Sequence, residues 1–292
     1  MYCKEPLIIG DMELYWLQGG NFRLDGGAIF GAVPKALWAQ RCPADAENTI
    51  LMCNDPLLIK TPQSIVLVDT GLGNKLSQKQ KAIYQVVSTW DLPACLEELG
   101  IAREEVTHVV LTHGDFDHAG GVAMLSDRGR LQLTFPRAMH YLQKKEWEDI
   151  KAPHPRAKSV YLPEDFSLLQ SSNLQLLDGE GEICPGISLR LSGGHTRGHQ
   201  IVEIRSAHQV AVHLGDLFPS HLHANPLWVM AYDNYPLTVI NRKNEYFSHY
   251  SAQDSWFTFY HDPSVRACRL DCRHKVKDTW PLPLSNVQTE VS

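Results

Sequence analysis

Residues 107–121, which read THVVLTHGDFDHAGG, decide the fold of this chain. Their first half is a short, β-branched apolar run, which is typical of a buried strand. The second half begins where that strand ends, and it carries two imidazoles and two carboxylates. Loops at strand ends commonly present binding groups, and imidazole with carboxylate is a donor set that suits divalent metal ions. The stretch therefore predicts a metal site that contains His113, Asp115, Asp117 and His118.

Candidate ligands recur later in the chain, each after a predicted strand. Taken alone each is a weak signal, because a solitary histidine is more often solvated or hydrogen-bonded than bound to a metal. Only their combination indicates a site. The segments are SGGHTRGHQ with His195 and His199, VAVHLGD with Asp216, and FTFYHDP with His261.

The predicted strands come in two batches, each followed by helices. This order is expected of an α/β fold in which two sheets pack together with helices on the outside. The predicted elements are a strand at 7–17, two strands within 57–71, a helix at 91–101, a strand at 107–113, several strands between 174 and 216, and a helix over 236–250.

We expect one domain over residues 1–270. The segment 271–292 loses its periodicity and carries Pro281 and Pro283, so we expect a peripheral tail there. The cysteines are odd in number and scattered, which favours reduced thiols over a disulfide framework. The N-terminus lacks the apolar core and cleavage site of a signal peptide, and no long apolar run follows, so we expect a cytoplasmic protein.

The charge of the chain argues against two classes of partner. The formal net charge is -6 and the isoelectric point is near 6.1, so the chain as a whole attracts neither nucleic acid nor an anionic membrane. No long run of Lys and Arg offers a local attraction instead. A small-molecule substrate is therefore the expected partner.

The combined motifs resemble the metallo-β-lactamase superfamily. Its pattern is an HxHxDH loop, a later GHTxGH histidine, an aspartate about twenty residues on, and a histidine near the end. A closer resemblance is to the branch of acyl-homoserine lactonases and methyl parathion hydrolase, which has an early FRLDGGAxFGxVPKxLW segment, present here at 22–38. The resemblance covers nearly the whole chain and implies a four-layer αβ/βα sandwich. The corresponding ligands here are His113, Asp115, Asp117, His118, His195, Asp216 and His261.

The resemblance also implies how these residues share two divalent metal ions. His113, position 115 and His195 would hold one ion, and Asp117, His118 and His261 the other. Asp216 would bridge the two ions together with a hydroxide, the nucleophile in hydrolysis of an ester-type bond. Asp117 would then relay a proton to the leaving oxygen, and His199 would lie beside the ligands.

The preferred substrate is a lactone or small carboxylic ester, with a phosphotriester as an alternative from the same branch. Aromatic residues are expected to line the substrate pocket, some from 22–38 and some from a loop at 221–236. The apolar segment 28–38 would also suit a homodimer contact. The predicted substrate-binding residues are Phe22, Phe30, Phe116, Trp228 and Tyr232.

One position departs from the family pattern. Where the motif has its second histidine, this chain has Asp115, which adds a third carboxylate to the site. An added negative charge lowers Lewis acidity and favours harder ions, so the metal is expected to be Zn or Fe, with Mn as a further option. Two alternatives to a hydrolase therefore stay open. One is a diiron enzyme that uses O₂, and the other is a metal-containing binding protein without catalysis.

Overall fold

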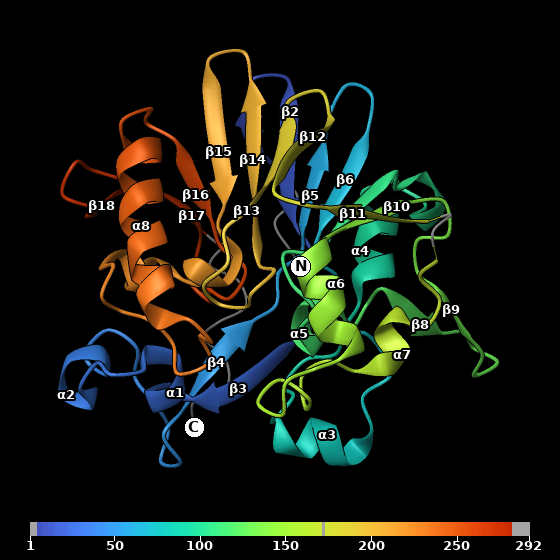
Figure 1. The fold of residues 1–292 in the computed structure, drawn as a ribbon, viewed down its shortest axis with the longest axis horizontal. Coiled ribbons are helices and arrows are strands. Elements are labelled where there is room, and N and C mark those ends of the chain that lie inside the picture. The colour runs from blue at the N-terminus through green and yellow to red at the C-terminus, as the bar shows by residue number, and fades with distance from the viewer. Residues whose placement is uncertain (1–4, 171–172, 282–292) are drawn as a thin grey trace.

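Two sheets that pack face to face form the centre of the molecule (Figure 1). The computed structural model describes residues 5–170 and 173–281. The first sheet has seven strands, mixed in direction, with parallel pairing from β6 through β7 and β10 to β11. In spatial order its strands are β1 (Leu7–Ile9), β2 (Met12–Trp16), β5 (Leu57–Lys60), β6 (Ile65–Val68), β7 (His108–Val110), β10 (Met139–Gln143) and β11 (Leu174–Leu177).

The second sheet also has seven strands and follows the chain order. Only β15 and β16 pair in parallel, because the helix α8 (Pro236–Ser251) returns the chain between them. The strands are β12 (Glu180–Cys184), β13 (Ile187–Leu191), β14 (Gln200–Ser206), β15 (Gln209–His213), β16 (Trp256–Thr258), β17 (Val265–Leu270) and β18 (Val276–Pro281).

Alternating side chains on these strands explain the layers. In β6, Val66 and Val68 belong to the apolar cluster between the sheets, whereas Leu67 points to the cluster on the other face. In β15, Ala211 faces the first cluster and Val212 faces the opposite way. Since successive side chains in a strand point to opposite faces, each apolar strand is buried twice. Both sheets therefore need a helix layer outside, and the predicted αβ/βα sandwich is confirmed.

The outer layers come from three longer helices (Figure 1). Leu92 and Leu96 of α4 (Leu92–Glu98) and Trp147 of α6 (Lys144–Lys151) pack on the first sheet. Phe247 and Tyr250 of α8 pack on the second. The predicted helices at 91–101 and 236–250 are thereby confirmed. In the described part of the chain no helix is both long enough and apolar enough to span a bilayer.

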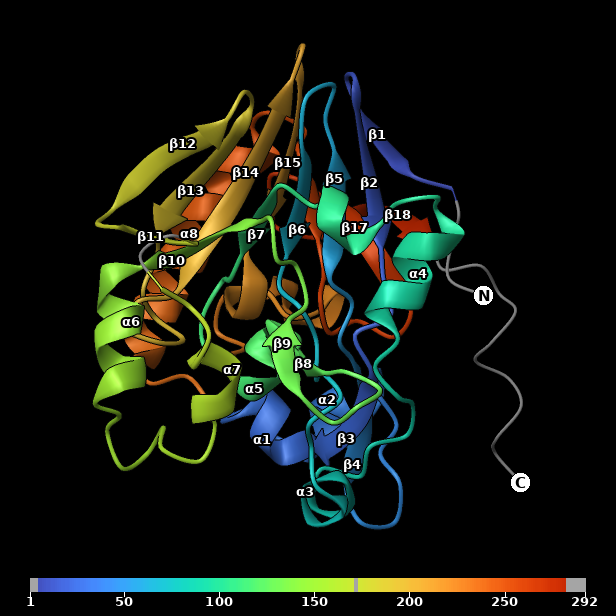
Figure 2. The same ribbon diagram turned by 90° about the vertical axis from the view of Figure 1, so that its right-hand side faces the viewer.

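Smaller elements complete the structure, and several gather at one end of the sandwich (Figure 2). Segment 21–38 forms a strand and two short helices. The elements are β3 (Asn21–Asp25), α1 (Gly26–Phe30), α2 (Lys35–Trp38), β4 (Thr49–Cys53), α3 (Gln78–Ile83), η1 (Arg103–Glu105), α5 (Phe116–Ala119), β8 (Ala123–Leu125), β9 (Leu131–Leu133), α7 (Pro163–Phe166), η2 (Gly215–Leu217) and η3 (His221–Ala224).

Two sequence predictions are wrong. The expected single strand at 7–17 is a hairpin, because Gly10 adopts a positive φ of 60° and turns the chain between Ile9 and Met12. The expected tail at 271–292 is wrong for 276–281, which forms β18 and pairs with β17. The side chains of this strand are mostly polar and exposed, so the sequence pattern does not indicate a strand. Backbone hydrogen bonds to β17 hold it at the edge of the sheet. Residues 282–292 lie outside the described residues.

The cysteines match the expectation of reduced thiols. Every cysteine in the described residues is free. Cys3 lies outside them.

Candidate metal centre

The predicted ligands lie together at one end of the sandwich, in loops that follow strands of both sheets. Strand ends can bring together residues that are far apart in the chain, because neighbouring strands finish near the same edge. In the first sheet His113 follows β7, Asp115 is the N-cap of α5, and α5 contains Asp117 and His118. In the second sheet His195 lies between β13 and β14, Asp216 follows β15, and His261 follows β16.

His113, Asp115 and His195 form what we name the first group. Asp115 Oδ2 lies 3.7 Å from His113 Nε2 and 3.6 Å from His195 Nε2. The two imidazoles are buried, whereas the side chain of Asp115 is 18% exposed. The predicted departure from the family motif therefore places a carboxylate oxygen close to both imidazole nitrogens.

Asp117, His118 and His261 form the second group. Asp117 Oδ2 lies 3.7 Å from the Nε2 atom of each histidine. The two Nε2 atoms are 3.1 Å apart. One oxygen and two imidazole nitrogens of this group therefore converge on the same point.

Asp216 lies between the two groups. Its Oδ1 atom is 3.3 Å from His118 Nε2 and 3.2 Å from His261 Nε2, both in the second group. Its Oδ2 atom is 3.5 Å from His195 Nε2 in the first group. Each oxygen of one carboxylate therefore faces a different group, which is the position required of a bridging ligand.

Each of the four histidines in the two groups has a hydrogen-bond partner at Nδ1, so its Nε2 atom faces the other donors of its group. A hydrogen bond at the outer nitrogen fixes both the tautomer and the ring orientation, as is usual for metal-binding histidines. The Nδ1 partners are Thr112 Oγ1 at 3.0 Å for His113, Asp69 Oδ2 at 2.9 Å for His118, Asp233 Oδ1 at 2.8 Å for His195, and the Cys53 carbonyl at 2.8 Å for His261.

The donor chemistry fits a bound cation. Nδ1 of His118 faces a carboxylate and Nδ1 of His261 faces a carbonyl, so both rings carry their proton there. Their Nε2 atoms then present lone pairs to one another at 3.1 Å, next to the oxygens of Asp117 and Asp216. Converging lone pairs repel unless a positive charge lies among them.

The distances fit as well. Donor atoms at about 2.1 Å from a tetrahedral ion are about 3.4 Å apart, close to the separations within both groups. Within the described residues, His113 Nε2 and Asp216 Oδ1 are buried and lack a hydrogen-bond partner. Such atoms are costly unless they bind something.

The electrostatic state of two buried groups, His113 and Asp216, also suits metal binding. Burial lowers the pKa of His113 well below its ordinary value, and His118 and His195 lower it further. Burial alone would raise the pKa of Asp216, but His118, His261 and His195 outweigh it and hold this pKa well below its usual range. A neutral imidazole and an ionised carboxylate are the forms that ligate metals. At His118 and His195 burial opposes the charged ring, but Asp216 and the other neighbouring carboxylates outweigh it and raise the pKa of each ring well above its ordinary value.

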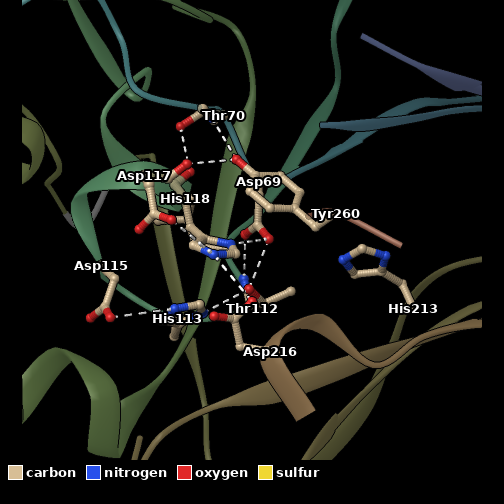
Figure 3. A network of polar contacts seen from close by, with 12 residues as sticks. Asp69, Thr70, Thr112, His113, Asp115, Asp117, His118, His213, Asp216 and Tyr260 are labelled. Carbon is tan, nitrogen blue, oxygen red and sulfur yellow. Dashed lines mark hydrogen bonds and ion pairs between the residues drawn. The ribbon is translucent and has the colours of Figure 1, made fainter. Parts of the chain in front are cut away.

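Sequence reasoning missed two supporting carboxylates. Asp69 accepts hydrogen bonds from Thr112 N at 2.7 Å and from Thr112 Oγ1 at 2.8 Å, and it contacts His118 (Figure 3). Asp233 contacts His195 and accepts from Met230 N at 2.8 Å. Asp69 had one usable signal, an aspartate directly after a buried strand, whereas the loop around Asp233 offered none.

Two further residues back the second group. The Tyr260 hydroxyl donates to the Asp117 carbonyl at 2.6 Å, and its ring stacks on His118 with centroids 4.2 Å apart (Figure 3). Thr70 donates to the His118 carbonyl through N and Oγ1, at 2.7 and 2.8 Å. The backbone carbonyls of Asp117 and His118 are therefore bonded to residues that lie just after strands.

The structure places His199 next to Asp216, as predicted. The Asp216 backbone N–H donates to His199 Nε2 at 3.2 Å, and His199 Nδ1 lies 2.7 Å from Ser192 Oγ. Burial and the neighbouring His195 lower the pKa of His199 well below its ordinary value. The neutral ring therefore fixes the backbone of Asp216.

The predicted pocket residues occupy different environments. Phe22 and Phe116 are in edge contact, with centroids 6.3 Å apart, and Phe22 lies 6.4 Å from the His261 ring. Tyr232 is 42% exposed, on the solvent side. Sequence reasoning missed Tyr84, which stacks on Phe116 with centroids 4.3 Å apart. An aromatic cluster thus adjoins the second group.

Phe30 and Trp228 belong to a second cluster of rings, together with Trp38 and His223. Phe30 is 1% exposed and stacks on Trp38 and His223, with centroids 5.1 and 5.0 Å away. Trp228 contacts Phe30 edge-on at 5.7 Å and is partly buried. The prediction that Phe30 lines a pocket is wrong, because its ring is enclosed by these contacts and supports the packing instead.

A family model and several known proteins are similar to this chain. The model of the metallo-beta-lactamase superfamily matches residues 55–278. A probable metallo-hydrolase of Mycobacterium tuberculosis is 31% identical over 197 residues, 60% of this chain and 59% of that protein. The match thus spans less than two thirds of that relative. An N-acyl homoserine lactonase of Bacillus cereus is 23% identical over 204 residues, 66% of this chain and 70% of that protein.

A solved structure supports the same relationship over a greater length. The crystal structure of a probable metal-dependent hydrolase from Staphylococcus aureus is 36% identical, with a TM-score of 0.90. The alignment covers 96% of this chain and 100% of that one. The family model and the similarity of fold and sequence agree, and the chain belongs to the metallo-β-lactamase superfamily.

Proposed function

We propose that the chain is a dinuclear metal-dependent hydrolase of ester-type bonds. The observation that carries this proposal is that two groups of donors face one shared carboxylate, Asp216. In this assignment the first group holds one divalent ion and the second group holds the other. The ions are Zn or Fe, with Mn as a further option, because the donors are imidazoles and carboxylates.

The residues of the chain divide the work of hydrolysis. When bound, two divalent ions lower the pKa of a water that they share and polarise the oxygen of the bond to be cleaved. Asp216 lies close to both groups and so sets their relative position, and His199 fixes the backbone of Asp216. Asp117, 12% exposed at its side chain, is placed to take up a proton and pass it to the leaving oxygen.

A lactone or a small carboxylic ester is the proposed substrate. Tyr84 and Tyr232, which are partly exposed, give the side of the second group an aromatic surface, against which the carbon skeleton of such a molecule can pack. Phe22 and Phe116 are 1% and 5% exposed, so the predicted contact of these two rings with substrate is replaced by packing behind Tyr84. Tyr232 is 42% exposed, and partial burial of its hydroxyl together with the nearby Asp25 and Asp117 raises its pKa, which places it close to the second group. The Bacillus cereus relative, named an N-acyl homoserine lactonase, supports the lactone over a phosphotriester.

One observation favours a second candidate, a diiron enzyme that uses O₂. Asp115 adds a carboxylate to Asp117 and Asp216, so the site holds more negative charge than the HxHxDH pattern would give. Carboxylate-rich sites favour harder ions such as iron and manganese. Lactone hydrolysis by a colourless, iron-free protein would exclude this candidate.

Metal content per chain, measured on protein purified without added metal, tests the proposal first. About two equivalents of zinc, together with hydrolysis of a panel of lactones and esters, would support the hydrolase. Mostly iron or manganese would call for O₂-dependent assays. A chain that binds no metal would contradict the proposal, and full metal loading without hydrolysis across the panel would favour a binding protein.

A further inference from the structure

A buried carboxylate on α6 connects two of the loops that form the site. Glu146 lies in the first turn of this helix and is 0% exposed. Its two oxygens accept four hydrogen bonds from groups far from it in sequence. The donors are Gly114 N at 2.9 Å and Tyr161 Oη at 2.9 Å for Oε1, and Thr196 Oγ1 at 2.6 Å and Gly198 N at 3.1 Å for Oε2.

Two glycines allow this approach. A Cβ at position 198 would overlap the backbone nitrogen of Glu146, and a Cβ at position 114 would come within 2.7 Å of Ile150 on the same helix. Any larger residue would push its loop away from α6. Both loops therefore lie directly on the helix, because each has a glycine at the point of contact.

A second contact fixes one of these loops to the same helix. The Arg197 guanidinium donates to both oxygens of Asp149, at 2.8 to 3.2 Å, and to the Lys145 carbonyl at 3.1 Å. Arg197 lies between Thr196 and Gly198, the two donors to Glu146 Oε2. The loop that carries His195 is thus bound to α6 at three consecutive residues.

The residues that Glu146 holds are the chain neighbours of one metal group. Gly114 stands between His113 and Asp115, and Thr196 directly follows His195. His113, Asp115 and His195 are the three members of the first group. We infer that Glu146 is a positioning residue that sets the geometry of the first group and leaves the second group to other supports. The inference rests on the proposed dinuclear centre.

The second group has its own anchors, which do not involve α6. His118 is fixed by Asp69 at Nδ1 and by Thr70 at its carbonyl, and the Asp117 carbonyl accepts from Tyr260. His261 is fixed by the Cys53 carbonyl. Loss of Glu146 should therefore weaken one metal position selectively, which a general loss of folding stability would not do.

A glutamine at position 146 is the sharpest test. A carboxylate only accepts hydrogen bonds, and all four of its partners donate. The amide of Glu146→Gln has nearly the same shape, but its NH₂ must face either the Gly114 N–H or the Gly198 N–H. A hydroxyl can rotate to become an acceptor, whereas a backbone N–H cannot. The substitution therefore releases at least one loop.

The experiment measures zinc retained by the full chain, loaded with two equivalents of Zn²⁺, as a competing chelator is added. His261→Ala leaves only the first group complete, and His195→Ala leaves only the second. Adding Glu146→Gln should weaken zinc binding about 10–100-fold in the His261→Ala background, the usual cost of losing an outer-shell partner. In the His195→Ala background it should leave binding unchanged.

Glu203→Gln is the matched control, because Glu203 is also buried and accepts from a tyrosine, Tyr250, at 2.8 Å. It should change neither background. Thr196→Val, which removes one donor and keeps the carboxylate, should weaken the first group less than Glu146→Gln and stays testable if that variant fails to fold. Equal weakening in both backgrounds, or none, would overturn the inference. A parent chain that retains no zinc would instead refute the proposed dinuclear centre.

Discussion

The two donor groups contain similar side chains, but different parts of the fold support them. In the second group, His118 and Asp117 are tied to the sheet through Asp69, Thr70 and Tyr260, all at strand ends or directly after them. In the first group only His113 is held at a strand end, through Thr112, and the other supports lie outside the sheets. Its loops lie on α6 through Glu146, and His195 is held by Asp233 in the loop before α8.

This difference indicates where the site can vary. A group fixed by the sheets inherits their rigidity, whereas a group fixed by surface loops moves whenever those loops move. Asp115, the residue that departs from the family motif, belongs to the group held by loops, and it is the most exposed of the donors in that group. We therefore expect the first group to bind its ion more weakly and to be the more tolerant of substitution.

Removing the shared ligand should give the largest effect, because it erases the difference between the groups. In Asp216→Ala both zinc equivalents should be weakened by more than about 100-fold, since a direct ligand counts for more than an outer partner, which costs 10–100-fold. Chelator competition would measure it. Asp278→Ala, at an exposed strand position, is the control. Loss of only one equivalent would show that Asp216 does not bridge.

Asp69→Asn should act mainly on the second group. The asparagine cannot accept from Thr112 and His118 as strongly as the carboxylate does, so His118 loses the partner that orients it. We expect zinc binding to fall about 10–100-fold in the His195→Ala background. The fall in the His261→Ala background should be smaller, because Asp69 reaches His113 only through Thr112. The reverse order would contradict the comparison.

Asp233→Asn should give the opposite pattern. It weakens the hold on His195 Nδ1 but leaves the second group untouched. We expect about a tenfold loss of zinc affinity in the His261→Ala background and no change in the His195→Ala background. If both backgrounds lost affinity alike, the loop before α8 would have to support the whole site.

Asp115→His should change the choice of metal more than the strength of binding. The substitution restores the HxHxDH pattern and removes one negative charge, which should favour zinc over iron or manganese severalfold. Loading the chain from equimolar mixtures of the ions and counting each ion retained would measure the preference. An unchanged ratio would show that the third carboxylate has little influence on the first group.

The smallest effect concerns the framework behind the second group. Burial raises the pKa of Asp165 to about 7, although Lys75, 3.0 Å away, opposes this. Lys75 also contacts the carbonyl of Gly120, the C-cap of α5. Because the folded pKa is the higher one, Asp165 contributes stability below about pH 4 that is lost as the pH rises through about 7.

Asp165→Asn has no such titration. The free energy of unfolding of the variant should therefore improve relative to the unmodified chain between pH 4 and pH 8, by on the order of a few kcal/mol at most. Urea unfolding of both proteins across this range, compared as a difference, cancels the titration of the histidines. A difference that stays constant with pH would contradict the assignment.

The sequence predicts the donors better than their supports. His113 to His118 form a contiguous motif, whereas His195, Asp216 and His261 are weak signals one by one, so the full donor set could be predicted only from their combination and the family resemblance. Glu146 could not, because the pattern around it indicates a polar surface helix, although the structure buries it completely. Its partners are between 15 and 52 positions away.

The same limit applies to the fold. The apolar strands at 57–71 and 107–113 are visible because both of their faces are buried. The edge strand β18 is not, since backbone hydrogen bonds to β17 hold it and its side chains are largely exposed. Phe30 shows the complementary error, because the aromatic content of a segment does not reveal whether a ring meets a ligand or other rings.

The division of ligands between the two sheets has a consequence for the order of folding. His113, Asp115, Asp117 and His118 follow a strand of the first sheet, whereas His195, Asp216 and His261 follow strands of the second. Neither donor group is complete in one sheet, so a cation cannot gather the full set of donors before the sheets have docked. Bound metal should then leave the rate of folding unchanged and slow the rate at which the sheets separate.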